Sequence, residues 1–372
     1  MLTSLEIRNF RAFSHLVINR LGRVNLVVGR NNVGKTCLLE ALRLYDSRGA
    51  VPVIAAILTS RNEVRLDPVH ERALPMLDML FHKTPELDTS LHLSIGPSDL
   101  SDQHRDVLMI SGREFALGRV GHPAYPRDVL SVGGLSINCG AESTEVGYDD
   151  FFSERRTGSA TVFGGNSGIA GSPLVELPFL TAAPVSEDVV ARWWDAVVLT
   201  ELKDDIVETV RSLDPSVLDI NFVAHPLDPY RRLAMVRSAS ISGPVPLRSL
   251  GDGVVRVFAF ATALQYHGIS SEPGEMGRAL LFDEVENGIH HSFHFNLWKS
   301  LFRLARLNDV QVFATTHSWD CLRGFARAVA EDKEADALAI RLEKVEGEER
   351  TGAVIIDRDD LPIVVRDSIE VR

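Results

Sequence analysis

Hydrophobic positions in the first part of the chain predict two strands, a buried strand and a helix. Residues 3–8 and 15–19 alternate between apolar and polar, which is typical of strands with one buried face. Residues 24–28 form a short apolar run that ends at Gly29, as expected of a buried central strand. After Thr36 the apolar residues recur at helical spacing, at Leu38, Leu39, Leu42 and Tyr45. We therefore expect a strand, a glycine-containing loop and a helix in this order.

The middle of the chain divides into strand-like, glycine-rich and helical segments. Residues 50–82 look helical in parts, and apolar positions alternate between 91 and 120 as in antiparallel strands, which predicts a β-rich side layer. Residues 133–172 combine many glycines with polar residues and predict a loop or mobile insertion. Residues 186–213 form the strongest helical block, and 199–201 are a candidate break between two helices.

The C-terminal part alternates helices with buried strands. The expected units are a loop at 248–253, a helix to about Tyr266, a strand at 279–283, a helix at 292–306, a strand at 310–316 and a helix after Ser318. This alternation predicts a mainly parallel sheet. The segments ALAIRLEKV and GAVIID predict a terminal hairpin or a pair of edge strands.

These elements predict an α/β fold with a mainly parallel sheet, a β-rich side layer and an inserted helical lobe. Residues 1–132 would form the N-terminal part of the main lobe and its side layer. Residues 133–245 would be an insertion, in which a glycine-rich loop precedes the helical lobe. Residues 246–372 would complete the main lobe.

The composition is that of an ordinary globular protein. With 45% hydrophobic residues, a chain of 372 residues can bury a sizeable core. No apolar run reaches the roughly 18 residues that a membrane span needs, and Glu6 and Arg8 interrupt the N-terminus before a signal-like core forms. We therefore expect a cytoplasmic location and no membrane. Three scattered cysteines predict reduced thiols rather than disulfides or a metal cluster.

Residues 29–36, GRNNVGKT, match the phosphate-loop pattern of glycines followed by a lysine and a hydroxyl residue. The glycines let backbone N–H groups surround a phosphate, the lysine adds a positive charge, and the hydroxyl can bind Mg²⁺. The predicted nucleotide contacts are Gly29, Asn31, Asn32, Gly34, Lys35 and Thr36. A plain glycine turn is the alternative, but the predicted strand and helix on either side favour a nucleotide site.

Asp283 and Glu284 follow the apolar run ALLF at the carboxyl end of a predicted strand. In nucleotide sites of this kind the aspartate holds Mg²⁺, and the glutamate orients or deprotonates the attacking water. Two acids after a strand are common on protein surfaces, so Asp283 and Glu284 indicate a nucleotide site only because the chain also contains a phosphate loop. We predict Thr36 and Asp283 as metal ligands and Glu284 as a catalytic residue.

Two further segments fit the same site. Ser249, Gly251 and Gly253 stand at the start of a predicted helix, where free N–H groups and the helix dipole favour an anion. Ser249 taken alone would be read as a helix cap. His317 ends the strand after that of Asp283 and can reach a γ-phosphate, although a lone histidine is more often structural.

The order of LEIRNFRAF, GRNNVGKT, SLGDG, LLFDEVENGIH and FATTHS resembles the ABC-like heads of SMC, RecF and OLD-type ATPases. The chain is most similar to stand-alone AAA family ATP-binding proteins of bacterial phage-defence operons. The resemblance covers residues 1–48 and 190–372, and we match no motif between 50 and 185. It implies a P-loop NTPase fold of the ABC-ATPase-head type, with ATP and Mg²⁺ as cofactors.

The resemblance also implies roles for single residues. Lys35 and Thr36 would belong to Walker A, and Asp283 and Glu284 to Walker B. Residues 249–253 would be the signature loop, which acts on the opposite subunit. His317 would be the switch histidine, and Arg11 would lie near the nucleotide.

Two departures from the family pattern stand out. The Q-loop glutamine, which links the γ-phosphate to the helical lobe, has Gln103 as its only candidate, and the DQHRD context does not settle it. OLD-type nucleases continue into a Toprim domain, whereas the residues after His317 do not resemble one. We therefore expect no nuclease activity.

The resemblance implies a head that dimerises around ATP, as a homodimer or as a higher oligomer built from dimers. This head would regulate a separately encoded effector, a nuclease or toxin, in anti-phage defence. We expect the effector to dock on residues 133–172 or on the strands from Ala337 onward. The alternatives are a RecF-like clamp that binds DNA, and a scaffold that binds ATP with little turnover. The net charge of −12 argues against coating nucleic acid, although a local basic groove leaves binding open.

Overall fold

The computed structural model describes residues 1–67, 72–82, 91–98, 107–115, 131–147, 151, 154–157, 160–163, 179–270, 279–345 and 350–366. Gln103 and the glycine-rich residues 164–172 lie outside the described residues.

A six-stranded sheet forms the centre of the molecule. Its strand order is β12 (Phe179–Leu180), β16 (Ala279–Phe282), β17 (Gln311–Thr315), β3 (Val24–Gly29), β18 (Ala337–Lys344) and β19 (Thr351–Ile356). All neighbouring pairs are parallel except β18 and β19. Every residue of β3 and β17 is buried, because both faces of this sheet are covered. The predicted mainly parallel sheet is confirmed.

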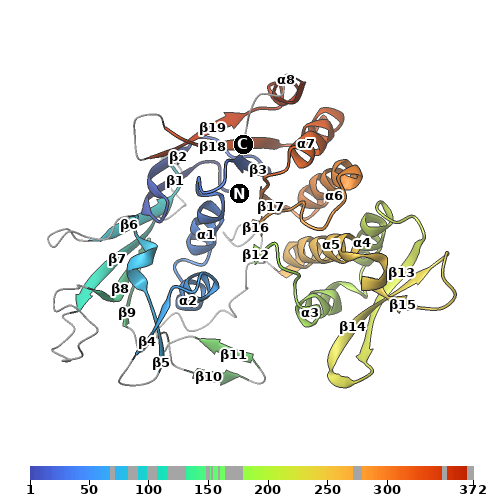
Figure 1. The fold of residues 1–372 in the computed structure, drawn as a ribbon, viewed down its shortest axis with the longest axis horizontal. Coiled ribbons are helices and arrows are strands. Elements are labelled where there is room, and N and C mark those ends of the chain that lie inside the picture. Colours follow the sequence, from blue (N-terminus) through green and yellow to red (C-terminus); the bar gives the residue numbers. More distant parts are fainter. Residues whose placement is uncertain are drawn as a thin grey trace.

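A second sheet of six antiparallel strands lies at one end of the molecule (Figure 1). Its order is β2 (Phe13–Ile18), β1 (Leu5–Phe10), β6 (His92–Gly96), β7 (Leu108–Phe115), β8 (Ser131–Cys139) and β9 (Glu142–Gly147). Helix α1 (Lys35–Asp46) lies between the two sheets, where Leu38 and Leu39 share one core with Ile95 and Phe313. This sheet is the predicted β-rich side layer.

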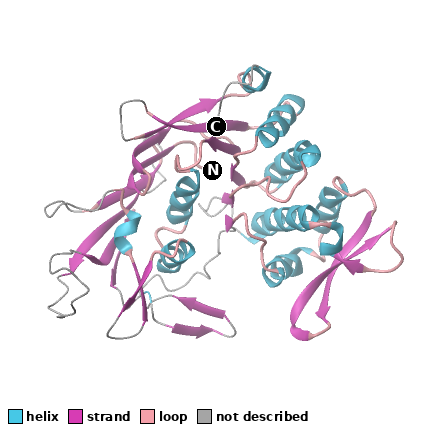
Figure 2. Ribbon diagram, viewed as in Figure 1, coloured by secondary structure: helices cyan, strands magenta, loops and turns pink. Residues whose placement is uncertain are grey.

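Helices cover the opposite face of the central sheet (Figure 2). They are α5 (Asp252–Ser270), α6 (His294–Leu307), α7 (Trp319–Glu331) and the short α8 (Leu361–Arg366). Trp298 and Phe325 pack edge to face, with ring centroids 4.9 Å apart, and join α6 to α7. No helix in the described part of the chain has the length and apolar character that a membrane span needs.

The helical lobe joins α5 through a common core. It consists of α3 (Glu187–Val197), α4 (Leu202–Arg211), β13 (Val217–His225), β14 (Asp228–Ser238), β15 (Val245–Pro246) and the 3₁₀ turn η3 (Leu247–Leu250). Trp194 of α3 is fully buried, and its ring centroid lies 5.3 Å from that of Phe258 in α5. The predicted break at 199–201 is confirmed, whereas the β13–β14 hairpin was not predicted.

The glycine-rich segment forms strands where the sequence predicts a loop. β8 and β9 are paired from Gly134 opposite Gly147 to Cys139 opposite Glu142. The expected domain boundary between residues 132 and 133 falls inside β8. A Cβ atom at Gly134 would lie 2.6 Å from the carbonyl oxygen of Val146. Glycine therefore permits a close approach of two strands here rather than a turn, so the loop prediction is wrong for these residues.

Small elements complete the described chain. They are α2 (Val51–Ser60), β4 (Val64–Asp67), β5 (Arg72–Pro75), the 3₁₀ turn η1 (Leu77–Leu80), β10 (Glu154–Thr157), β11 (Ala160–Phe163) and the 3₁₀ turn η4 (His291–Phe293). The partly helical character expected for residues 50–82 is thus found in α2 and η1, with a strand pair between them.

The terminal strands form the predicted hairpin, but not a pair of edge strands. β18 pairs with β3 on one side and with β19 on the other, so it is internal to the sheet. β19 in turn lies beside β2 of the antiparallel sheet. This position leaves β18 no open edge for the docking surface expected from Ala337 onward.

We predict that Gly134→Ala destabilises the protein by about 1–3 kcal/mol, because the added methyl group meets the backbone of β9. The measurement is the midpoint of thermal unfolding, which should fall. Ser143→Ala, at an exposed position of β9, is the matched control and should change stability by no more than about 0.5 kcal/mol. An unchanged midpoint for Gly134→Ala would contradict the observed register of β8 and β9.

Candidate functional site

The loop between β3 and α1 has a backbone that requires its glycines. Gly29 and Gly34 have φ angles of 148° and 105°. A Cβ atom would lie 2.5 Å from the Leu342 carbonyl oxygen at Gly29, and 2.7 Å from the Phe13 ring at Gly34. Larger residues are therefore excluded at both positions. The loop leads directly into the start of α1, where the backbone N–H groups of the first turn attract anions. The first turn of α1 carries no acidic residue that would repel a phosphate.

Lys35 extends back over this loop. Its Nζ donates to the carbonyl oxygens of Gly29 at 2.7 Å and Arg30 at 3.0 Å. Burial lowers the pKa of the Lys35 ammonium, and the carboxylates of Asp283 and Glu284 oppose this shift. The positive charge is thus held over the loop, and Asn31 and Asn32 lie exposed at its tip.

The carboxylate of Asp283 joins three segments of the chain. Its Oδ2 accepts from the Thr36 hydroxyl at 3.1 Å, and its Oδ1 accepts from the Thr315 hydroxyl at 2.5 Å. Its backbone N–H donates to the carbonyl of Leu180 in β12. The start of α1 and the carboxyl ends of three parallel strands therefore meet at one residue.

Hydroxyl and carboxylate oxygens are the ligands that Mg²⁺ prefers, and this ion takes few protein ligands and completes its shell with water and phosphate. No group of three or more His, Cys, Asp or Glu side chains in the described ranges could hold a metal by itself. Thr36 and Asp283 fit an ion that a substrate phosphate helps to bind.

Glu284 and His317 lie together beside Asp283. Glu284 has a left-handed backbone, with φ 51°, and its N–H donates to Thr315 Oγ1 at 2.9 Å. His317 Nδ1 lies 3.8 Å from Glu284 Oε1 and 3.4 Å from Glu286 Oε1. Glu286 is 9% exposed and also accepts from the His317 N–H. The His317 imidazole is therefore held by the buried carboxylate of Glu286 and lies next to the accessible carboxylate of Glu284.

The loop of Ser249, Gly251 and Gly253 occupies a different part of the molecule. Ser249 is exposed in η3, and α5 begins at Asp252, so Gly251 rather than Ser249 precedes the helix. A Cβ atom at Gly251 would have no neighbour within 4 Å, whereas one at Gly253 would lie 2.8 Å from the Gly288 carbonyl oxygen. No contact joins Ser249 or Gly251 to the cluster around Asp283 among the described residues, whereas Gly253 packs against Gly288 of the loop that follows Asp283.

Arg11 also lies apart from that cluster. Its guanidinium binds the Glu63 carboxylate with distances of 2.8 and 2.7 Å, and its Nε lies 3.1 Å from Glu40. The side chain is 6% exposed. Two carboxylates neutralise this arginine, so its expected contact with a nucleotide stays a prediction.

The structure adds Thr315, Arg256 and the loop after β12 to the site, none of which the sequence assigned to it. Thr315 was predicted as a strand residue, and its hydroxyl within the segment ATTHS was the available signal. Arg256 has no such signal, because its partners are backbone carbonyls of segments far away in the sequence.

Two sequence families match parts of the chain. The family described as "AAA ATPase domain" matches residues 1–50, which include the phosphate loop. The family described as "AAA domain, putative AbiEii toxin, Type IV TA system" matches residues 195–320, which include Ser249, Asp283 and His317.

The fold itself occurs in solved ATPase heads. The chain is similar to the SmcHead bound to the C-winged helix domain of ScpA, with a TM-score of 0.52, 11% identity and coverage of 96% of this chain and 98% of that chain. It is equally similar, with a TM-score of 0.52, to the Smc head domain with a coiled coil and joint from Pyrococcus yayanosii, at 9% identity and 99% coverage of both chains.

The protein is an ATPase with an ABC-like head fold. This confirms the predicted fold class, a P-loop NTPase of the ABC-ATPase-head type. A curated relative of similar length, named ATP/GTP phosphatase, occurs in Helicobacter pylori. It is 22% identical over an alignment of 359 residues, which covers 89% of this chain and 89% of the relative.

In this ATPase we predict that Lys35→Ala weakens ATP binding severely, because the variant loses the ammonium group that lies over the phosphate loop. Equilibrium binding of a fluorescent ATP analogue measures the effect. Lys299→Ala, which removes an exposed lysine of α6, is the control and should bind the analogue normally. Unchanged affinity in a folded Lys35→Ala protein would remove the phosphate loop from the site.

Proposed function

We propose that the ATPase binds ATP with Mg²⁺ at the phosphate loop and hydrolyses it with Glu284 and His317. The observation that carries this proposal is the Asp283 carboxylate, which accepts from Thr36 and Thr315 at the ends of neighbouring elements. Lys35 exchanges its two carbonyl acceptors for phosphate oxygens when ATP enters. Thr36 and Asp283 would hold Mg²⁺, which would neutralise negative charge on the phosphates.

Glu284 is the proposed general base. Its side chain is 42% exposed, so a water molecule can reach it, and its carboxylate can accept a proton as the water attacks the γ-phosphate. His317 donates a hydrogen bond to a γ-phosphate oxygen from the ring nitrogen that does not face Glu286. The chemistry thus consists mainly of positioning and charge stabilisation.

A second subunit completes each site. The open surroundings of Gly251 support this arrangement, because a Cβ atom at this position would have no neighbour within 4 Å in its own subunit. Free N–H groups at the start of α5 would bind the γ-phosphate of the opposite subunit. Two heads would then close around two ATP molecules and open after hydrolysis.

The loop after β12 takes the role of the Q-loop, which links the γ-phosphate to the helical lobe and for which the sequence offered only Gln103. It starts beside Asp283, since the Asp283 N–H donates to Leu180, and it runs to α3 of the helical lobe. We propose that Thr181 in this loop, rather than Gln103, senses the γ-phosphate. The helical lobe then extends from residue 179 to the start of α5.

We further propose that the closed dimer regulates a separately encoded effector in anti-phage defence. The match to a family whose description includes a toxin system supports this role, and so does a structural relative that was solved with a partner protein bound. β9 is an outer strand of the antiparallel sheet and three of its six residues are exposed, so it offers a docking edge within the expected segment 133–172.

We predict that Glu284→Gln retains ATP but hydrolyses it about 10²–10⁴-fold more slowly, because the amide cannot accept the proton. The variant should accumulate as an ATP-bound dimer. Phosphate release and light scattering with and without ATP measure the two effects. Glu334→Gln changes an exposed glutamate far from the site and should behave as the unchanged protein.

Two outcomes would contradict the proposal. Normal turnover by Glu284→Gln would exclude this residue as the base. A Glu284→Gln protein that binds ATP and yet stays monomeric would exclude the two-subunit arrangement.

A further inference from the structure

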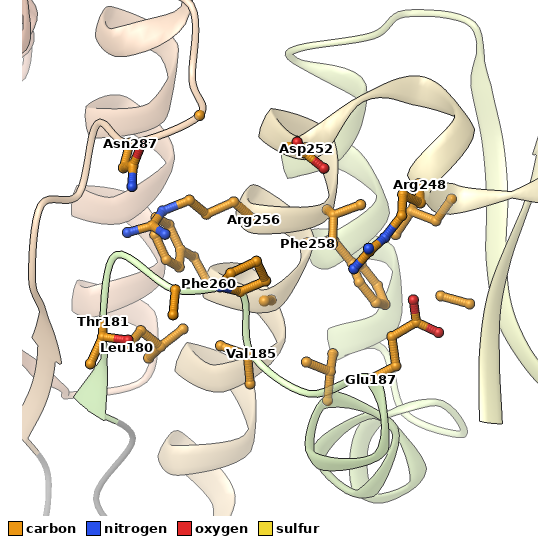
Figure 3. A pocket seen from close by; sticks show the side chains of 18 of the residues that line it. Leu180, Thr181, Val185, Glu187, Arg248, Asp252, Arg256, Phe258, Phe260 and Asn287 are labelled. Atoms are coloured by element: carbon orange, nitrogen blue, oxygen red, sulfur yellow. The ribbon is translucent and has the colours of Figure 1, made fainter. Parts of the chain in front are cut away.

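Arg256 lies one turn beyond the signature loop and points away from it, towards the catalytic edge of its own subunit. Figure 3 shows it on α5, beside Asn287 and Phe260 and across from Thr181, in a pocket of about 260 Å³. Its guanidinium lies 5.1 Å from the ring centroid of Phe260. Residues of the helical lobe and of the loop after Asp283 both line this pocket, and so does Arg256.

The guanidinium binds the backbone of both loops at this edge. Nη2 donates to the carbonyl oxygens of Asp283 at 3.2 Å and Glu284 at 2.9 Å, and Nη1 donates to that of Ala182 at 3.0 Å. Asn287 Nδ2 donates to the same Ala182 oxygen at 3.2 Å. Only arginine has a planar fork of donors that reaches two segments at once.

These bonds act on a residue that is conformationally strained. Glu284 is not a glycine and yet has φ 51°, which persists only where surrounding contacts enforce it. Thr315 fixes its N–H, and Arg256 fixes its carbonyl. The two contacts together set the direction in which the Glu284 side chain leaves the backbone.

We propose that Arg256 is a positioning residue that holds Glu284 and the loop after β12 in the arrangement required for hydrolysis in the same subunit. The proposal rests on the function assigned above to Glu284. It distinguishes Arg256 from the signature loop on the same helix, which acts on the opposite subunit. α5 is a long helix packed in the main core, so the loops rather than the helix shift when the contact is lost.

The first test compares Arg256→Gln and Arg256→Lys with the unchanged protein. Arg256→Gln should lower kcat by about tenfold to a hundredfold, the usual range for groups that orient a catalytic residue, and should leave KM for ATP and the thermal midpoint nearly unchanged. Arg256→Lys keeps the charge without the fork and should recover part of kcat. Arg323→Gln, an exposed arginine of α7, should have no effect.

The second test decides in which subunit Arg256 acts. In mixed dimers of Lys35→Ala with Arg256→Gln, the single ATP site uses Glu284 of the Arg256→Gln copy and the signature loop of the other copy. We expect this mixture to be as impaired as Arg256→Gln itself. Activity equal to that of the unchanged protein mixed with Lys35→Ala would show that Arg256 acts through its signature loop, and would overturn the proposal.

The two proposals fail differently. Normal kcat in Arg256→Gln, or full recovery by Arg256→Lys, would overturn the role of Arg256 while leaving Glu284 as the base. Normal turnover in Glu284→Gln would instead overturn the proposed function. A clear fall in the thermal midpoint of Arg256→Gln, with the same fall in Arg256→Lys, would show that Arg256 only stabilises the fold and would overturn its role as a positioning residue.

Discussion

The Asp283 carboxylate, bonded to the hydroxyls of Thr36 and Thr315, is the contact on which the arrangement of the site depends. A charged acceptor forms stronger hydrogen bonds than a neutral one, so Asp283 fixes the start of α1 against the ends of β16 and β17. The phosphate loop, the proposed base and the proposed switch histidine thereby come to lie at one edge of the sheet. Thr36 and Asp283, which already face each other here, would together hold Mg²⁺.

Strand order explains why distant segments meet here. β3, β17, β16 and β12 are neighbours and parallel, so their carboxyl ends lie at the same edge, where open α/β sheets bind ligands. Thr181, Asp283 and His317 follow three of these strands. The signature loop stands at the start of α5, where Ser249 is exposed and Gly251 has open surroundings, as the proposed contact with another subunit requires.

Local patterns in the sequence were sufficient for the phosphate loop, the strand before Asp283 and the helices around it, because each is specified by neighbouring residues. Three features depended on tertiary contacts and escaped prediction. Gly134 allows a close approach of strands, yet in sequence it is indistinguishable from a turn glycine. β18 pairs with β3 across more than 300 residues. Arg256 binds backbone carbonyls, which carry no side-chain signature.

In the proposed function, the Asp283 site hydrolyses ATP only when a second subunit supplies its signature loop. This dependence is measured by phosphate release at saturating ATP and Mg²⁺ over a wide range of protein concentrations. Turnover per molecule should rise with concentration and then reach a plateau as heads pair. Turnover per molecule that stays constant in a range where light scattering finds only monomers would contradict it.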